Sequence, residues 1–362
     1  MTASKDIRPL TSLRFFAAMW VVLYHYWPSL SPSLPPLVDK GYLGVELFFT
    51  LSGFILCHVY LDSVADRRFD YFGFLWARLA RIYPLHLATL VGVGAMAVAA
   101  EAVGRSVDAN VLSWAALPAN LLLVQAWGLA PVAGWNHPSW SISAEWFAYL
   151  SFPVFAWAAL KLRARPRLAV VGALALALAL YALFPPLAGF PLTRATIAWG
   201  ALRIVPCFAL GCAINLLWRA RPVSTGRTAG LGAAFSGAAI GLAAQLQAPD
   251  PLLVALFGGL IFGLASLSSA SENTGGGRIL VYLGEISYSI YMVCIPWKLF
   301  FVGGVAALLH LDKTHLPLAV WLVLTLSVIP LAALSHHLIE RPARSLMRGR
   351  ARALPMLTVS VA

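Results

Sequence analysis

The chain has 362 residues, of which 60% are hydrophobic and only 11% are charged. Soluble domains carry roughly 25% charged residues, so this composition excludes a soluble enzyme such as a Rossmann or TIM-barrel protein. The formal net charge of +12 comes from short basic clusters between apolar segments, a pattern typical of membrane topology signals and not of nucleic-acid binding. The apolar stretches are continuous and do not alternate with polar residues, which also argues against a transmembrane β-barrel.

Eleven apolar segments follow one another along the chain, and most are long enough to cross a hydrocarbon layer about 30 Å thick. In chain order they cover residues 9–28, 41–60, 82–100, 111–129, 140–160, 168–187, 198–218, 228–246, 252–269, 279–303 and 318–338. We therefore predict an all-α polytopic membrane protein. Residues 1–340 are expected to form a single membrane domain, followed by a basic cytoplasmic tail over residues 341–362.

Basic residues decide which segments cross, because Lys and Arg are enriched in cytoplasmic loops. If the N-terminus with Lys5 and Arg8 is cytoplasmic, the arginine-rich loop at residues 67–81 is also cytoplasmic after two crossings. The basic cluster at residues 161–167 reaches the same side only if residues 111–139 do not cross. That region contains several prolines and glycines, which suits a re-entrant or interfacial segment buried against protein. The charge pattern predicts about ten transmembrane helices with both termini in the cytoplasm.

Ionisable side chains inside membrane spans are costly and usually functional. The ten-helix arrangement places His25, Glu46 and Glu145 in the outer half of the membrane. The residues that it places near the inner face are Arg14, Arg78, Arg81, Glu285 and Glu340. We therefore expect two layers of polar groups at different depths.

Arg14 and His25 lie on the same predicted helix, eleven residues apart. This spacing corresponds to a rise of about 16 Å and to nearly the same helical face. An anionic ligand held by Arg14 from the cytoplasm could thus extend toward His25, and histidine titrates near neutral pH, as a general base requires. The structural alternatives are that Arg14 binds lipid headgroups and that His25 only joins two helices by a hydrogen bond.

The other ionisable residues have structural alternatives as well. Glu46 and Glu145 could pair with the intramembrane cations Arg203 and Lys298 and serve stability alone. The arginine pair within residues 78–81 could anchor its helix at the membrane interface.

The cysteines give no indication of a metal site. All four, Cys57, Cys207, Cys212 and Cys294, lie within apolar stretches and form no C-x-x-C pair. No histidine accompanies them at metal-ligand spacing. We interpret them as core thiols and expect no metal.

Five of the candidate residues belong to three longer strings of sequence. The R-x10-H spacing of Arg14 and His25 occurs within LTSLRFFAAMWVVLYHYWP. Glu46 occurs within GYLGVELFFTLSGFIL. Arg78 and Arg81 belong to the R-x-x-R-I-Y-P element of WARLARIYPLHL.

Three further strings follow toward the C-terminus. The first, HPSWSISAEWFAYLSFPVF, contains a W-S-x-S-x-E motif with Trp140, Ser143 and Glu145, and Tyr149 follows one turn later. The other two are YLGEISYSIYMVCIPW and HHLIERPAR. With all six strings in this order, the sequence resembles the acyltransferase-3 family of bacterial integral membrane acyltransferases, whose members modify polysaccharides and other acceptors at the cell envelope.

The resemblance implies a reaction, a donor and a location. The implied reaction is transfer of an acyl group, acetyl by default, from cytoplasmic acyl-CoA (acetyl-CoA) to a hydroxyl of an envelope or exported glycan. The implied location is the bacterial inner (cytoplasmic) membrane. The expected partners are the glycan or another hydroxyl-bearing acceptor and membrane lipids, and no nucleic acid.

The resemblance also suggests a role for each motif residue. His25 would be the general base, oriented by Glu145 or Glu46. The residues expected to hold the CoA phosphates through charge-assisted contacts are Arg14, Arg78 and Arg81. The residues expected to bind the acceptor are Trp140, Ser143 and Tyr149.

Two positions depart from the family pattern. Cys294 stands where family members commonly have histidine, and Trp146 stands where a second acidic residue commonly follows Glu145. We therefore assign neither residue a catalytic role. The main alternative function is a membrane transporter or flippase of a polar substrate, because intramembrane Arg, Glu and His also build substrate paths. A purely structural scaffold is a third alternative.

Overall fold

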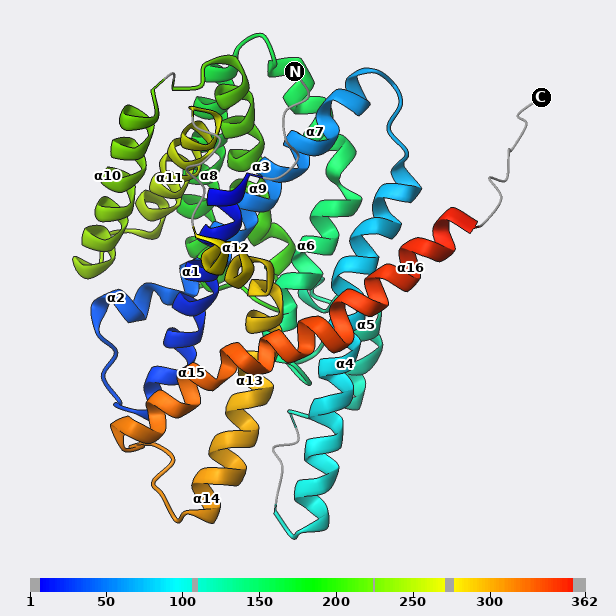
Figure 1. Ribbon diagram of the computed structural model, residues 1–362, viewed down its shortest axis with the longest axis vertical. Helices are drawn as coiled ribbons and strands as arrows, with labels where there is room; N and C mark the ends of the chain where they lie inside the picture. Colours follow the sequence, from blue (N-terminus) through cyan, green and yellow to red (C-terminus); the bar gives the residue numbers. More distant parts are fainter. Residues whose placement is uncertain (1–6, 106–109, 224, 271–276, 354–362) are drawn as a thin grey trace.

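The computed structural model describes residues 7–105, 110–223, 225–270 and 277–353, and all regular structure in these residues is helical. The helices are α1 (Arg8–Tyr26), α2 (Pro36–Asp39), α3 (Gly44–Ala65), α4 (Tyr71–Ala102), α5 (Leu117–Leu121), α6 (Trp140–Leu150), α7 (Phe152–Leu162), α8 (Pro166–Ala188), α9 (Gly200–Ala220), α10 (Gly226–Gln245), α11 (Asp250–Ala270), α12 (Arg278–Glu285), α13 (Ser287–Phe300), α14 (Ala306–Leu308), α15 (Leu318–Ser335) and α16 (Arg341–Ala353), with short 3-10 and π-helical turns between them. Seven helical segments of the described residues are long and apolar enough to cross a membrane. The predicted all-α polytopic membrane fold is therefore confirmed (Figure 1).

Two of the predicted spans are each built from two helices. The span predicted at residues 140–160 is interrupted at Ser151, between α6 and α7. Pro153 stands in the first turn of α7 and has no backbone N–H with which to continue the hydrogen bonds of α6. The span predicted at residues 279–303 is divided at Ile286, between α12 and α13. Three of the predicted spans are not among the seven long apolar segments, namely α1, the α6–α7 pair and α10. The total of ten transmembrane helices therefore stays a prediction.

Residues 111–139 form only short helices in the described chain, and the longest of them, α5, has five residues. Parts of the segment are buried against other helices, whereas residues such as Trp114 and Leu129 are exposed. The buried Asn136 donates through Nδ2 to Thr89 Oγ1 of α4 and to Met292 O of α13, each at 3.0 Å. Irregular backbone is tolerated at membrane depth where protein buries it. The described part of this segment therefore has no helix able to cross, as the charge pattern predicts.

Ion pairs sort the helix ends into two groups at opposite ends of the bundle. Asp62, near the end of α3, accepts two 2.9 Å hydrogen bonds from Arg219 of α9 and lies 3.7 Å from Arg163, which follows α7. Just before the opposite end of α3, Lys40 pairs with Asp250 of α11 at 2.7 Å. The basic segments after α7 and α9 therefore share one end of the bundle, as predicted. That this end is cytoplasmic stays a prediction.

Close packing of α3 against α9 forms the centre of the bundle. A side chain at Gly53 of α3 would collide with the backbone oxygen of Phe208, and one at Gly211 of α9 would collide with that of Thr50. Only glycine allows the two backbones to approach this closely. The approach holds α3 in place against α9, and one face of α3 lines the cavity described below.

The helix α16 continues the direction of α15 and runs obliquely across the bundle toward α4 (Figure 1). A π-helical turn, His336–Glu340, joins the two helices. Trp76 of α4 donates through Nε1 to Met347 O of α16 at 2.9 Å. This contact holds the basic helix α16 against the membrane-spanning helices.

A basic cavity as the candidate active site

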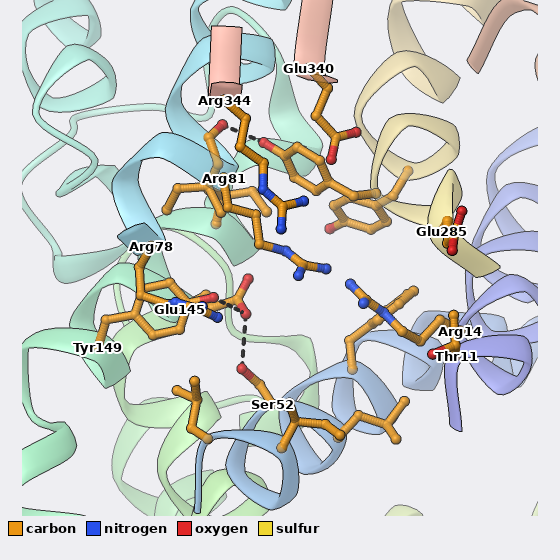
Figure 2. Close-up of a pocket in the computed structure, with 18 of the residues that line it drawn as sticks. Thr11, Arg14, Ser52, Arg78, Arg81, Glu145, Tyr149, Glu285, Glu340 and Arg344 are labelled. Carbon is orange, nitrogen blue, oxygen red and sulfur yellow. Dashed lines mark hydrogen bonds between the residues drawn. The ribbon is translucent and has the colours of Figure 1, made fainter. Parts of the chain in front are cut away.

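A cavity of about 660 Å³ lies between α1, α3, α4, α6, α12, α13 and α16 (Figure 2). Its lining comes from residues within 7–14, 45–56, 78–82, 141–149, 285–291 and 336–348. Sites for drug-sized ligands and cofactors have volumes of roughly 300–1,000 Å³. The cavity is therefore large enough for a cofactor-sized ligand.

The cavity is strongly basic. Six arginines and three glutamates line it: Arg14, Arg78, Arg81, Arg341, Arg344, Arg348, Glu145, Glu285 and Glu340. Figure 2 shows the guanidinium groups of Arg14 and Arg81 pointing toward one another across the cavity, with Arg344 on the same side as Arg81. Because the positive charges outnumber the negative ones and converge, the cavity favours an anionic ligand.

Four of these arginines have side chains that make no hydrogen bond and no ion pair within the described residues. Arg341 is exposed, whereas Arg14, Arg81 and Arg344 are half-buried. By contrast, Arg78 donates to Tyr60 Oη at 3.3 Å and lies over the rings of Tyr60 and Phe74, 5.7 and 5.9 Å from their centroids. A half-buried guanidinium without a partner is costly, so a ligand with several anionic oxygens would stabilise this arrangement.

Glu145 of α6 lies in the cavity and faces the arginines. Its Oε1 accepts hydrogen bonds from Ser52 Oγ at 2.9 Å and from Tyr149 Oη at 2.5 Å (Figure 2). Glu145 shares this cavity with Arg14, whereas the sequence pattern assigns the two residues to separate layers of polar groups. The physical reason for the meeting is that α6 begins among buried residues, with Ser139 and Trp140 only 1% and 5% exposed, directly after the irregular segment 111–139.

Glu46 lies outside the cavity lining and forms a buried ion pair. Arg203 of α9 donates through Nε to Oε1 at 2.5 Å and through Nη2 to Oε2 at 3.0 Å, and the two side chains are 3% and 0% exposed. The ring of Trp140 lies 4.6 Å from the Arg203 guanidinium carbon. Glu46 therefore pairs with the intramembrane cation Arg203, which is the structural alternative given above. Its carboxylate does not reach the arginines of the cavity.

His25 is not among the residues that line the cavity. It lies in the last turn of α1, where its backbone oxygen accepts a 2.6 Å hydrogen bond from Lys298 Nζ. Arg14, three turns earlier on the same helix, does line the cavity. Of the predicted helical face that joins Arg14 to His25, only the part near Arg14 therefore lines the cavity.

The three residues expected to bind the acceptor lie in different surroundings. Tyr149 lines the cavity. Ser143 is fully buried, and its Oγ donates to Leu123 O at 2.8 Å and accepts from Ala126 N at 3.0 Å. Trp140 is also buried, against the ion pair of α3 and α9. Ser143 and Trp140 thus hold neighbouring segments in place, and neither reaches the cavity.

Three arginines of α16 and Ser52 of α3 are not among the candidate site residues that the sequence predicts. Arg341, Arg344 and Arg348 of α16 line the cavity, although a separate basic tail is expected over residues 341–362. Their spacing of three and four residues places them on one helical face, which is a signal that the sequence does carry. Ser52 has no such signal, because it is one hydroxyl within a long apolar helix.

The fold and the cavity define a polytopic membrane protein with a basic cavity among its helices. Comparison with known proteins identifies its family. Residues 9–337 match the family described as acyltransferase domain, and the chain belongs to this acyltransferase-3 family of membrane acyltransferases.

Two curated relatives match the chain to different extents. The chain is similar to acyltransferase MdmB of Streptomyces mycarofaciens, with 30% identity over 377 residues that cover 94% of this chain and 92% of that protein. It is also similar to protein 2 in the picA locus of Rhizobium radiobacter, with 33% identity over 121 residues that cover 29% of this chain and 61% of that protein. No solved structure matches the chain.

Proposed function

We propose that the protein transfers an acyl group from cytoplasmic acyl-CoA, acetyl-CoA by default, to a hydroxyl of an envelope or exported glycan or a related acceptor. The observation that supports a CoA donor is the basic cavity, where Arg14, Arg81 and Arg344 present guanidinium groups without a hydrogen-bond partner in the described chain. CoA carries several phosphate charges at one end and a long, mostly neutral arm that ends in the thioester. Charge-assisted hydrogen bonds from arginine suit the first of these ends.

The two ends of the cavity differ in a way that suits such a donor. Arg341, Arg344 and Arg348 come from α16, which contacts Trp76 near the start of α4, the helix that follows the end of α3. Val45 and Phe48 come from the first turns of α3, at the opposite end of that helix. We therefore place the phosphates among the arginines and the acyl group toward Phe48.

His25 is the proposed general base. In the proposed reaction the acceptor hydroxyl oxygen attacks the thioester carbonyl carbon and its proton passes to His25. The carbon–sulfur bond then breaks, and the CoA thiolate leaves and takes the proton from His25, which restores the base. The R-x10-H motif shared with the family supports this role. Because His25 does not line the cavity, the acyl group has to move from the cavity toward His25 before transfer.

The remaining motif residues take supporting roles in this proposal. Glu145, which accepts hydrogen bonds from Ser52 and Tyr149, faces Arg14 and balances part of the positive charge around the donor. Membrane lipids surround the helices. The proposed location is the bacterial inner membrane, with both termini in the cytoplasm.

The test uses purified protein in nanodiscs, acetyl-CoA, and envelope glycans isolated from cells that lack the gene. We expect glycan-dependent release of the CoA thiol and a matching ester on the glycan, measured with a thiol reagent and by mass spectrometry. Transport of unmodified glycan without thiol release would contradict acyl transfer and favour the transporter or flippase.

A further inference from the structure

The cavity ends in an apolar wall at the start of α3. This wall is formed by Val45, Phe48 and Phe49 of α3, Ile142 of α6 and Tyr291 of α13. Phe48 is half-buried, whereas the other four side chains are 3% to 6% exposed. The ring of Phe48 meets that of Tyr291 edge to face, with centroids 6.2 Å apart. A ligand that enters past the arginines therefore meets two aromatic rings at the far end.

The hydroxyl groups at this end are already engaged by the protein. Tyr291 Oη donates to Pro138 O at 2.9 Å, and Ser141 Oγ donates to Tyr291 Oη at 2.8 Å. These bonds tie α13 to the segment that precedes α6. A polar group of a ligand thus gains little here, and an apolar group that displaces water from the wall is favoured.

We propose that this wall binds the acyl chain of the donor, and that Phe48 and Tyr291 set the longest chain that the cavity accepts. The inference rests on the proposed function, because it takes the ligand of the cavity to be acyl-CoA. It adds that the donor's chain length is selected when the donor binds, by contact with two named rings, before the acyl group moves toward His25.

The two sides of the wall respond differently to substitution. Phe48→Ala removes a ring whose exposed part faces the cavity and lengthens the space available to the chain. Val45→Phe adds a ring at the same end and shortens this space. The matched control is Phe155→Ala, because Phe155 of α7 packs on Phe208 with centroids 4.7 Å apart and does not line the cavity.

The experiment measures dissociation constants of CoA and of acyl-CoAs from acetyl to decanoyl by calorimetry, with the full chain in nanodiscs. Each methylene buried on the wall is expected to improve affinity about fourfold until the chain meets the rings. The chain length at which affinity stops rising is the break in this series. We expect Phe48→Ala to move the break to chains about two or more carbons longer and Val45→Phe to move it to shorter chains. CoA itself is expected to bind all variants alike.

The outcomes separate this inference from the function on which it rests. If CoA binds but all variants give the same chain-length series as wild type, the acyl site is overturned and the donor site stands. If neither CoA nor acetyl-CoA binds the wild type, the donor site is overturned and the acyl site with it. Should Phe48→Ala fail to yield monodisperse protein, Val45→Phe decides alone, and an unchanged break in that variant overturns the inference.

Discussion

Arg203 of α9 and Glu46 of α3 form a bidentate ion pair in the protein interior, with N–O distances of 2.5 and 3.0 Å. The pair joins two helices whose backbones approach closely at Gly53 and Gly211. Neither charged residue lines the basic cavity. The Glu46 carboxylate is therefore held by the architecture of the bundle and not by the candidate active site.

We expect Glu46→Gln to destabilise the fold by about 3–5 kcal/mol, because it leaves the buried charge of Arg203 without its partner. The midpoint of thermal unfolding in detergent measures this loss. A double variant, Glu46→Leu with Arg203→Met, is expected to recover much of the stability because it removes both charges. A Glu46→Gln variant with unchanged stability and abolished transfer would instead give Glu46 a catalytic role.

The close packing of α3 and α9 predicts that Gly211→Ala unfolds at a lower temperature than wild type, because the added methyl group collides with the backbone oxygen of Thr50. The matched control is Gly172→Ala on α8, where a Cβ would meet nothing within 4 Å. That change is expected to be neutral or to stabilise by up to about 1 kcal/mol. Equal melting temperatures of the two variants would contradict the packing argument.

Replacing Arg14, Arg81 or Arg344 by alanine is expected to weaken acetyl-CoA binding about tenfold or more, because a hydrogen bond to a charged group contributes about 1.5–3 kcal/mol. Calorimetry of the purified variants measures the change. The control is Arg163→Ala, whose side chain is 58% exposed outside the cavity and whose loss is expected to change affinity by less than about twofold. Equal effects in all four variants would assign the cavity arginines to lipid binding or to structure.

For His25→Ala we expect near-normal abundance and retained acetyl-CoA binding, because His25 lies outside the cavity lining. Transfer is expected to fall to less than about one hundredth of the wild-type rate, since a positioned base contributes roughly 100- to 10,000-fold. Single-turnover assays on monodisperse protein measure both properties. Transfer within a few-fold of wild type would move the search for the base to Glu145, which does line the cavity.

Single cysteines at Ala133 and Ala164, in a cysteine-free background, test the membrane topology. Both positions are exposed in the structure, and the four native cysteines are buried. With a membrane-impermeant reagent added outside intact cells, we expect labelling at position 133 and protection at position 164. The reverse pattern would contradict both the ten-helix arrangement and the cytoplasmic assignment of the basic end.

The sequence by itself determined the fold class, because long, continuous apolar runs with few charges can pair their backbone N–H and C=O groups within a membrane only by forming helices. Local patterns also placed Arg14, Arg78 and Arg81 in one layer near the basic end, and the structure brings all three to one cavity. The prolines and glycines of segment 111–139 likewise indicated that this segment does not cross the membrane as a helix. Each of these features depends on residues near one another in the chain.

Only the tertiary structure decided which ionisable groups meet. It pairs Glu46 with Arg203, brings Glu145 to the arginines, and leaves His25 outside the cavity. It also folds Arg344 of α16 back onto the site from a stretch that the sequence alone suggests is a tail. The depth of a residue depends on where its helix starts within the bundle, and its partners depend on which helices pack together. Both are set by packing between distant segments, and a pattern within one segment cannot encode them.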